Sequence, residues 1–167
     1  MKASLLAIIL ACPPMLVVGA HSQLSLRAWH AEEIALGWRD SVRQTLHYSC
    51  GPALLASSAQ AAGATISEFE LIHKANIDEA GITLAEFRRL ASGIGWHGNW
   101  YVGLYSNLLS TELPVAVHIS VPVHHFVLIH FLTDSHVLIE DPASGFRNVN
   151  RRLFEKWWSG YFYALDF

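Results

Sequence analysis

The hydrophobic periodicity of this chain changes partway along, and that change limits the possible folds more than any other feature. The first half carries helix signals. Ser67-Glu68-Phe69-Glu70 and Thr83-Leu84-Ala85-Glu86 both match a capping box, in which a Ser or Thr and a Glu three residues later satisfy each other's backbone N–H groups. Each box also has a hydrophobic residue before the cap and another in the first turn, so a helix is predicted to start at each.

The second half has the period of strands. Runs rich in β-branched residues at 114–119, 126–131 and 136–140 are predicted as strands, followed by a short helix at 151–158 and a closing strand at 161–165. Helices that precede strands, with short connections, are typical of an α+β fold. We therefore expect N-terminal helices packed on a mostly antiparallel sheet.

The N-terminal segment has the composition of a secretory signal. Residues 1–20 combine Lys2, an apolar run and small residues ending at Ala20, which predicts cleavage after Ala20 and export to the periplasm or the extracellular space. Ile9-Leu10-Ala11-Cys12 resembles a lipoprotein box, so lipidation of Cys12, or retention of the segment as an anchor, are the alternatives that would hold the protein at a membrane. Residues 21–167 show no repeat or linker and are expected to form a single domain.

Charge and cysteine content exclude two roles for the exported part. Removing residues 1–20 takes away Lys2 and leaves 10 basic and 14 acidic side chains, a formal charge of −4. A negative chain without basic clusters is not expected to bind nucleic acid. Removal of Cys12 would leave Cys50 as the single thiol, so no internal disulfide is expected.

The surroundings of Cys50 suggest a nucleophile. Ser49 is predicted to cap a helix that runs through Gln60, which places Cys50 in the first turn, where the helix dipole favours a thiolate. Gly51 would let a substrate backbone approach closely, and Pro52 is tolerated there because its missing N–H would have no intrahelical partner. The alternative is a buried structural cysteine.

A nucleophilic thiol needs a histidine and a group that orients it, and the strand pair 126–131 and 136–140 offers both. If the turn between the strands is centred on Thr133, His125 lies directly opposite Asp141, close enough for the carboxylate to fix the imidazole tautomer. If it is centred on Asp134, His125 becomes a diagonal neighbour of Asp141. The alternatives are a strand-end histidine bonded to backbone and a turn-forming aspartate. Gln44, six residues before Cys50, could donate to an oxyanion together with the Cys50 N–H.

Five short motifs in this order resemble the C39 peptidases, a family of papain-like cysteine proteases known as the processing domains of bacteriocin-exporting ABC transporters. The motifs are Gln44 with Tyr48-Ser49-Cys50-Gly51-Pro52-Ala53, then Leu113-Pro114-Val115-Ala116-Val117-His118, His125-Phe126-Val127-Leu128, Glu140-Asp141-Pro142-Ala143-Ser144-Gly145 and Phe154-Glu155-Lys156-Trp157-Trp158-Ser159-Gly160. The resemblance implies a papain-like fold, with Cys50 as nucleophile, His125 as general base and acid, Asp141 as orienting carboxylate and Gln44 as oxyanion donor.

The resemblance also implies a function, which is hydrolysis of peptide bonds in an exported peptide or protein, without a metal or other cofactor. Transporter-type members cleave leader peptides after a paired glycine, so small residues such as Gly-Gly are the expected target. The sequence contains no GxxxxGK[ST] phosphate loop, so we expect no ATP site in this chain. Two other functions stay open: a non-catalytic C39-like peptide-binding module that assists export, and a transglutaminase-like acyl transferase.

Two further groups of side chains have competing interpretations. His118, His124, His130 and His136 share parity along the strands, but no zinc-type motif accompanies them, and we expect them to face solvent rather than a metal. Four aromatic residues could line a peptide groove, but filling of the core is the expected role. They are Trp96, Trp100, Tyr101 and Tyr105.

Overall fold

The computed structural model of the protein describes residues 41–165. The predicted signal segment at 1–20 and the start of the domain predicted at 21–167 lie outside the described residues. Within residues 41–165, three helices precede the first strand and the strands form an antiparallel sheet, which confirms the predicted α+β class. In chain order the elements are α2 (Cys50–Ala61), α3 (Glu68–Lys74), α4 (Leu84–Gly93), β1 (Gly98–Val102), α5 (Tyr105–Leu109), β2 (Val115–Ile119), β3 (His125–Leu132), β4 (His136–Asp141), β5 (Gly145–Asn150), α6 (Arg151–Trp157) and β6 (Trp158–Leu165).

The strands form one six-stranded sheet with the order β1-β6-β2-β3-β4-β5, in which every neighbouring pair is antiparallel. The inner strands β2, β3, β4 and β6 confirm the sequence prediction. The two strands that the sequence did not indicate, β1 and β5, are the two edges of this sheet. Edge strands are partly solvated and need few apolar residues, so they lack the hydrophobic runs that marked the inner strands.

The capping boxes start their helices as predicted, although only one box is complete. Ser67 accepts a hydrogen bond from the backbone N–H of Glu70, and the Glu70 carboxylate accepts the Ser67 N–H at 2.8 Å. Thr83 accepts from the N–H of Glu86, but the Glu86 carboxylate turns to the N–H of Asn76 instead. α4 still begins at Leu84, directly after Thr83, because one cap bond is sufficient to end the preceding loop.

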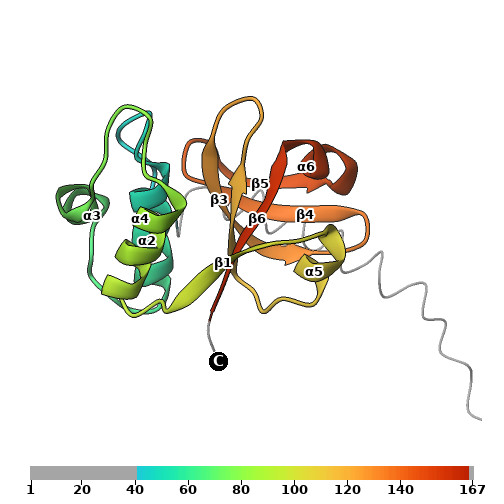
Figure 1. Ribbon diagram of the computed structural model, residues 1–167, viewed down its shortest axis with the longest axis horizontal. Coiled ribbons are helices and arrows are strands. Elements are labelled where there is room, and N and C mark those ends of the chain that lie inside the picture. The colour runs from blue at the N-terminus through green and yellow to red at the C-terminus, as the bar shows by residue number, and fades with distance from the viewer. Residues whose placement is uncertain (1–40, 166–167) are drawn as a thin grey trace, which may run out of the picture.

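Helices cover both faces of the sheet, and successive strand residues alternate between them. Phe126 and Leu128 pack with α2 and α4, whereas Val127 and Ile139 belong to a second core with α5 and α6. Figure 1 shows α2, α3 and α4 together on one side and α5 and α6 on the other. The alternation also separates two consecutive acidic residues of β4.

Glu140 points to α2, where it is 3% exposed and bonded to the Ser57 hydroxyl. Its second carboxylate oxygen pairs with His130 Nε2 at 2.7 Å. Asp141, the next residue, therefore projects away from α2. The two neighbouring carboxylates thus project from opposite faces of the sheet.

Three of the four aromatic residues whose role was open fill the core, as expected. Trp96 and Trp100 pack on Phe87 and Tyr163 beneath α4, and Tyr105 is only 3% exposed. Tyr101 is 46% exposed on the edge strand β1 and does not belong to a groove with the others.

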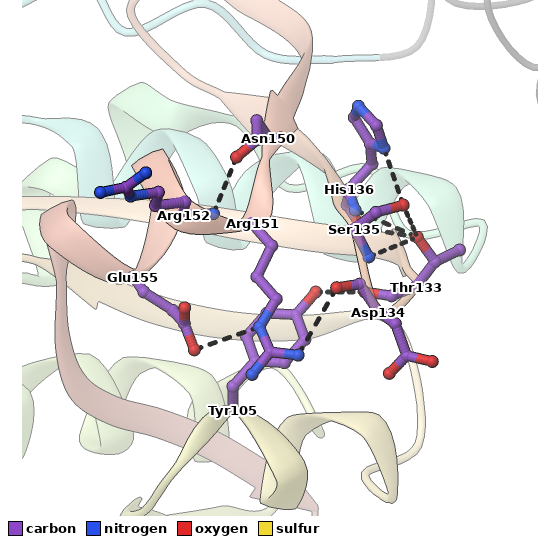
Figure 2. Close-up of polar contacts among 9 residues, drawn as sticks. All are labelled: Tyr105, Thr133, Asp134, Ser135, His136, Asn150, Arg151, Arg152 and Glu155. Atoms are coloured by element: carbon purple, nitrogen blue, oxygen red, sulfur yellow. Dashed lines mark hydrogen bonds and ion pairs between the residues drawn. The ribbon is translucent and has the colours of Figure 1, made fainter.

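Tyr105 joins three elements on the α5 and α6 side (Figure 2). Its hydroxyl donates to the carbonyl of Thr133 in the β3–β4 turn at 2.6 Å. The guanidinium of Arg151, at the start of α6, stacks 4.2 Å from the centre of the Tyr105 ring. The backbone N–H of Arg151 donates to the Ser135 carbonyl. This cluster holds the far end of the β3–β4 hairpin.

We expect Tyr105→Phe to lower the free energy of unfolding by about 1–2 kcal/mol, because the Thr133 carbonyl loses a partly buried donor. Burial raises the pKa of Tyr105 to about 12, against an opposing effect of Arg151, so the phenol stays a donor throughout the range of the experiment. Urea unfolding measures the change. The control is Tyr101→Phe at the exposed edge, and an equal loss in both variants would contradict the proposed role of the Tyr105 hydroxyl.

Candidate active site

Cys50 is the first residue of α2 and is 7% exposed. Ser49 occupies the N-cap position as predicted, but its hydroxyl makes no capping bond, so that part of the prediction was wrong. The hydroxyl lies instead 2.5 Å from the carboxylate of Glu68 in α3, the shorter of its two acceptor contacts, and 2.9 Å from the Leu46 carbonyl. As a consequence, the Ser49 side chain does not occupy an N–H group of the first turn.

Gly51 serves packing rather than access for a substrate, which corrects the expectation from the sequence. The residue is buried, and a Cβ atom there would overlap the side chain of Ile82 and lie 3.5 Å from Phe126. Glycine is therefore required for α2 to approach the segment before α4. This close approach sets the position of the helix that carries Cys50.

His125 and Asp141 are brought together, although not by the register that was considered first. β3 and β4 pair Ile129 with Ile139 and Leu128 with Glu140, and a bulge lies between Ile129 and Phe131. This corresponds to the register with His125 diagonal to Asp141. Direct opposition was wrong because the turn is not centred on Thr133: next to it Leu132 pairs with Val137, and the bulge then shifts the pairing by one residue. The imidazole still reaches across, and its Nε2 lies 2.7 Å from Asp141 Oδ1.

The His125 ring bridges the carboxylate and the thiol. Because Nε2 faces Asp141, Nδ1 is the nitrogen left for Cys50, whose side chain is near enough to the ring to contribute to its raised pKa. Burial alone would lower the pKa of His125. The hydrogen bonds to Asp141 and Cys50 outweigh burial and raise that pKa to about 9. The His125 ring, which lies between Asp141 and Cys50, is therefore protonated at neutral pH.

Asp141 is held by four groups. Oδ1 accepts His125 and the N–H of Ala143 at 2.8 Å, and Oδ2 accepts the Ser144 hydroxyl at 2.6 Å with Arg147 3.7 Å away. Burial opposes ionisation, but the bonds from His125 and Ser144 lower the pKa of Asp141 to about 2. Asp141 is therefore ionised at neutral pH. It also begins a turn, the role that the sequence offered as an alternative, because its carbonyl accepts the N–H of Ser144.

Ser144 is a site residue that the sequence analysis did not single out. The spacing Asp141-Pro142-Ala143-Ser144 is typical of a turn in which the carboxylate accepts bonds from the two residues that follow Pro142, and this signal could have identified it.

Gln44 lies beside these groups. Its backbone N–H donates to the Pro142 carbonyl at 2.9 Å, and its Nε2 donates to the Leu46 carbonyl at 2.8 Å. The amide carries two N–H bonds, so one remains for another acceptor. Gln44, His125 and Asp141 line one cleft of about 390 Å³, whose walls include the exposed apolar side chain of Val123. A second cavity of about 400 Å³, near Glu140, contains none of the predicted site residues.

The other histidines do not share one environment. His130 is paired with Glu140, and His118 is half-buried against the hydroxyl of Ser159 at 2.9 Å, so the expectation that these two face solvent was wrong. His124 is exposed and stacks on His118. Within residues 41–165 no three His, Cys, Asp or Glu side chains are grouped so that they could hold a metal ion.

The His125–Asp141 pair predicts a loss of stability in alkali. A raised pKa means that the folded state holds the proton more tightly than the unfolded chain. The contribution is therefore complete below about pH 6.5 and is lost as the pH rises through about 9, by up to about 3 kcal/mol. Urea unfolding at pH 6, 7.5 and 9.5 should show this decline in the parent protein and a flatter profile in His125→Gln. His97→Gln, at an exposed position, is the control, and a profile of His125→Gln as steep as the parent's would contradict the assignment.

A thiol at the start of a helix, facing an imidazole and a carboxylate on an antiparallel sheet, defines the papain-like class of domain. The model of the Peptidase C39 family matches residues 38–166, and the chain belongs to this family. This confirms the family that the five motifs indicated.

The chain is also similar to other proteins and to solved structures. An uncharacterized protein of Methanothermobacter marburgensis is 30% identical over 125 residues, which are 75% of this chain and 87% of that protein. The peptidase domain of the Streptococcus ABC transporter ComA is 21% identical, with a TM-score of 0.68 over 76% of this chain and 98% of that domain. A double glycine motif protease from an AMS/PCAT transporter, in complex with its leader peptide, is 18% identical, with a TM-score of 0.69 over 74% and 88% of the two chains. These two structures confirm the predicted fold.

Membrane attachment was expected only through residues 1–20. Among residues 41–165, no helix has both the length and the apolar character needed to cross a bilayer.

Proposed function

We propose that this protein is a cysteine endopeptidase that hydrolyses peptide bonds of an exported peptide or protein. The observation that carries the proposal is the position of the His125 ring, whose Nε2 bonds an ionised Asp141 at 2.7 Å and whose pKa is raised in part by the Cys50 side chain. A histidine between a thiol and a carboxylate is the arrangement needed to activate a sulfur nucleophile and later to return the proton.

In the proposed reaction, His125 Nδ1 already holds the proton given up by Cys50, and the Sγ thiolate attacks the scissile carbonyl carbon. The carbonyl oxygen becomes an oxyanion, which the N–H of Cys50 and the remaining N–H of the Gln44 side chain stabilise. His125 then protonates the departing amine as the C–N bond breaks, and a thioester remains on Cys50. A water molecule, deprotonated by His125, attacks the thioester and releases the acid product and the thiol.

Asp141 keeps the ring oriented during these proton transfers. Its Oδ1 accepts the Nε2–H of His125, which leaves Nδ1 toward the sulfur in both protonation states. The bonds from Ala143 and Ser144 hold the carboxylate itself. Both proton transfers therefore need little movement of the ring.

We further propose that cleavage follows small residues such as Gly-Gly and that the mature protein acts in the periplasm or outside the cell. The support for the first point is the likeness in fold to the double glycine protease bound to its leader peptide. The support for the second is the signal-like composition of residues 1–20.

The reactivity of Cys50 tests the proposed chemistry without a known substrate. We expect iodoacetamide to alkylate Cys50 at pH 6 at least about tenfold faster than it alkylates glutathione, because a paired imidazolium favours the thiolate. His125→Ala should lose this advantage. His47→Ala, an exposed side chain at the same cleft, should keep it. Alkylation at the rate of glutathione, unchanged in His125→Ala, would overturn the catalytic proposal.

Synthetic peptides test the preference separately. Peptides that differ only in carrying Gly-Gly, Ala-Ala or Leu-Leu before one bond should be cleaved in that order, with the new termini identified by mass spectrometry. Equal cleavage of the three would disprove the preference for small residues and leave the reaction itself in place.

A further inference from the structure

One buried carboxylate near Cys50 has no part in the proposed reaction as described so far. Glu68 is the first residue of α3 and is only 5% exposed. A carboxylate is rarely buried unless hydrogen bonds compensate for lost hydration. Here the compensation comes from the segment that leads to Cys50. Glu68 Oε1 accepts the backbone N–H of Thr45 at 2.9 Å and the hydroxyl of Ser49 at 2.5 Å.

These bonds continue to the side chain of Gln44. Ser49 Oγ accepts the N–H of Leu46 at 3.1 Å, and the Leu46 carbonyl accepts Gln44 Nε2 at 2.8 Å. Hydrogen bonds therefore link the Glu68 carboxylate to Ser49 and Ser49 to the Leu46 backbone. The Leu46 carbonyl, 2.9 Å from Ser49 Oγ, in turn holds the amide proposed as oxyanion donor. The bond to the N–H of Thr45 fixes the peptide group that follows Gln44 as well.

Other anchors hold the main chain of this segment but do not reach the Gln44 amide. The N–H of Val42 donates to the Ser57 hydroxyl at 2.8 Å, and the N–H of Gln44 donates to the Pro142 carbonyl. Both bonds fix the backbone to α2 and to the turn after β4. Within the described residues, the series through Ser49 and Leu46 is the one that links a buried charged group to the side chain.

We infer that Glu68 is a positioning residue for the oxyanion donor Gln44, an inference that rests on the proposed function. A hydrogen-bond donor stabilises a transition state most when it is already oriented before the charge develops. Glu68 orients the Ser49 hydroxyl and, through it, the Leu46 peptide that holds one N–H of the Gln44 amide. The second N–H is thereby fixed relative to Cys50.

Kinetics of variants of the full-length protein test this role. Glu68→Ala should lower kcat by about tenfold to a hundredfold with little change in KM, because a displaced donor weakens the transition state rather than substrate binding. Glu68→Gln should recover most of the loss, since an amide oxygen still accepts from Thr45 and Ser49. Glu70→Ala is the matched control. It removes the capping box of the same helix from an exposed position, so stability should fall while kcat stays unchanged.

A double-mutant cycle shows whether Glu68 acts through Gln44. Gln44→Ala alone should lower kcat by about 10²–10³-fold, the usual effect of losing one oxyanion donor. Glu68→Ala added to Gln44→Ala should cause no further loss. Additive losses, or a fall in kcat in Glu70→Ala equal to that in Glu68→Ala, would overturn the inference. If Glu68→Ala does not fold, Ser49→Ala interrupts the same series and takes its place in the cycle.

Hydrogen exchange of the Gln44 side-chain amide, followed by NMR, gives a readout that needs no activity. We expect faster exchange in Glu68→Ala and parental exchange in Glu68→Gln and Glu70→Ala. Unchanged exchange in Glu68→Ala would show that Glu68 does not hold the amide. Altered exchange in a protein without peptidase activity would instead keep the positioning role and reject the proposed function.

Discussion

Cys50→Ala is expected to remove peptidase activity almost completely, by about 10⁶-fold in kcat, which is the usual effect of losing the nucleophile of a catalytic triad. The reason is structural as well as chemical. Cys50 is the only cysteine among residues 41–165, and its neighbours in the first turn of α2 are Ser49, Gly51 and Pro52. The Ser49 hydroxyl is committed to Glu68, so it is not free to replace the thiol.

Cleavage of a Gly-Gly peptide, followed by mass spectrometry, measures the effect of Cys50→Ala, with circular dichroism to confirm that the variant folds. Because Cys50 is buried but small, replacement by alanine should leave the fold intact. A folded Cys50→Ala protein that still cleaves would reject Cys50 as nucleophile. If neither the parent nor the variant cleaves and both bind the same exported peptide, the domain is a binding module rather than an enzyme.

Asp141→Ala is the second large effect that we expect, with a loss of about 10⁴-fold in kcat. Without the carboxylate, nothing holds Nε2 of His125, and the ring loses both its orientation and the bond that raises its pKa to about 9. The proton would then leave the ring at a lower pH. The alkaline limb of the pH–rate profile should therefore move to lower pH.

Asp141→Asn separates orientation from charge. An asparagine oxygen can still accept Nε2–H, as it does in Cys-His-Asn proteases, but it carries no charge. We therefore expect a much smaller loss of kcat than in Asp141→Ala, together with the same shift of the alkaline limb of the pH–rate profile. Equal losses in the two variants would indicate that charge, rather than orientation, is the main contribution. Arg147→Gln, which removes only the 3.7 Å ion pair, is the control for changes at the same carboxylate.

Local signals in the sequence were sufficient for most of the fold. The cap at Ser67 forms within four residues, so it is readable without knowledge of the tertiary structure. The inner strands were readable because both of their faces are covered by helices, which requires long apolar runs. The edge strands β1 and β5 do not need long apolar runs, so the sequence did not mark them. The helix α5 is only five residues long, which is too short for a periodic pattern.

The site was predicted in its residues but not in its details. His125 and Asp141 meet as expected, yet the turn between β3 and β4 is not centred on Thr133, and no local pattern indicated its position or the bulge in β3. Ser49 was expected to cap α2, but a carboxylate nineteen residues away competes for its hydroxyl. Gly51 was assigned to the substrate, whereas the side chain that requires it is Ile82. For Ser49 and Gly51, a contact distant in sequence decided between two locally reasonable arrangements.

The separation of Glu140 and Asp141 on β4 has a consequence for how the two halves of the domain are aligned. Glu140 hydrogen-bonds α2, the helix that begins with Cys50, and Asp141 hydrogen-bonds the imidazole of His125 on the sheet. Slippage of β4 by a single position would exchange the two and leave both partners unmatched. The register of β4 therefore fixes the position of the Cys50 thiol relative to the His125 ring.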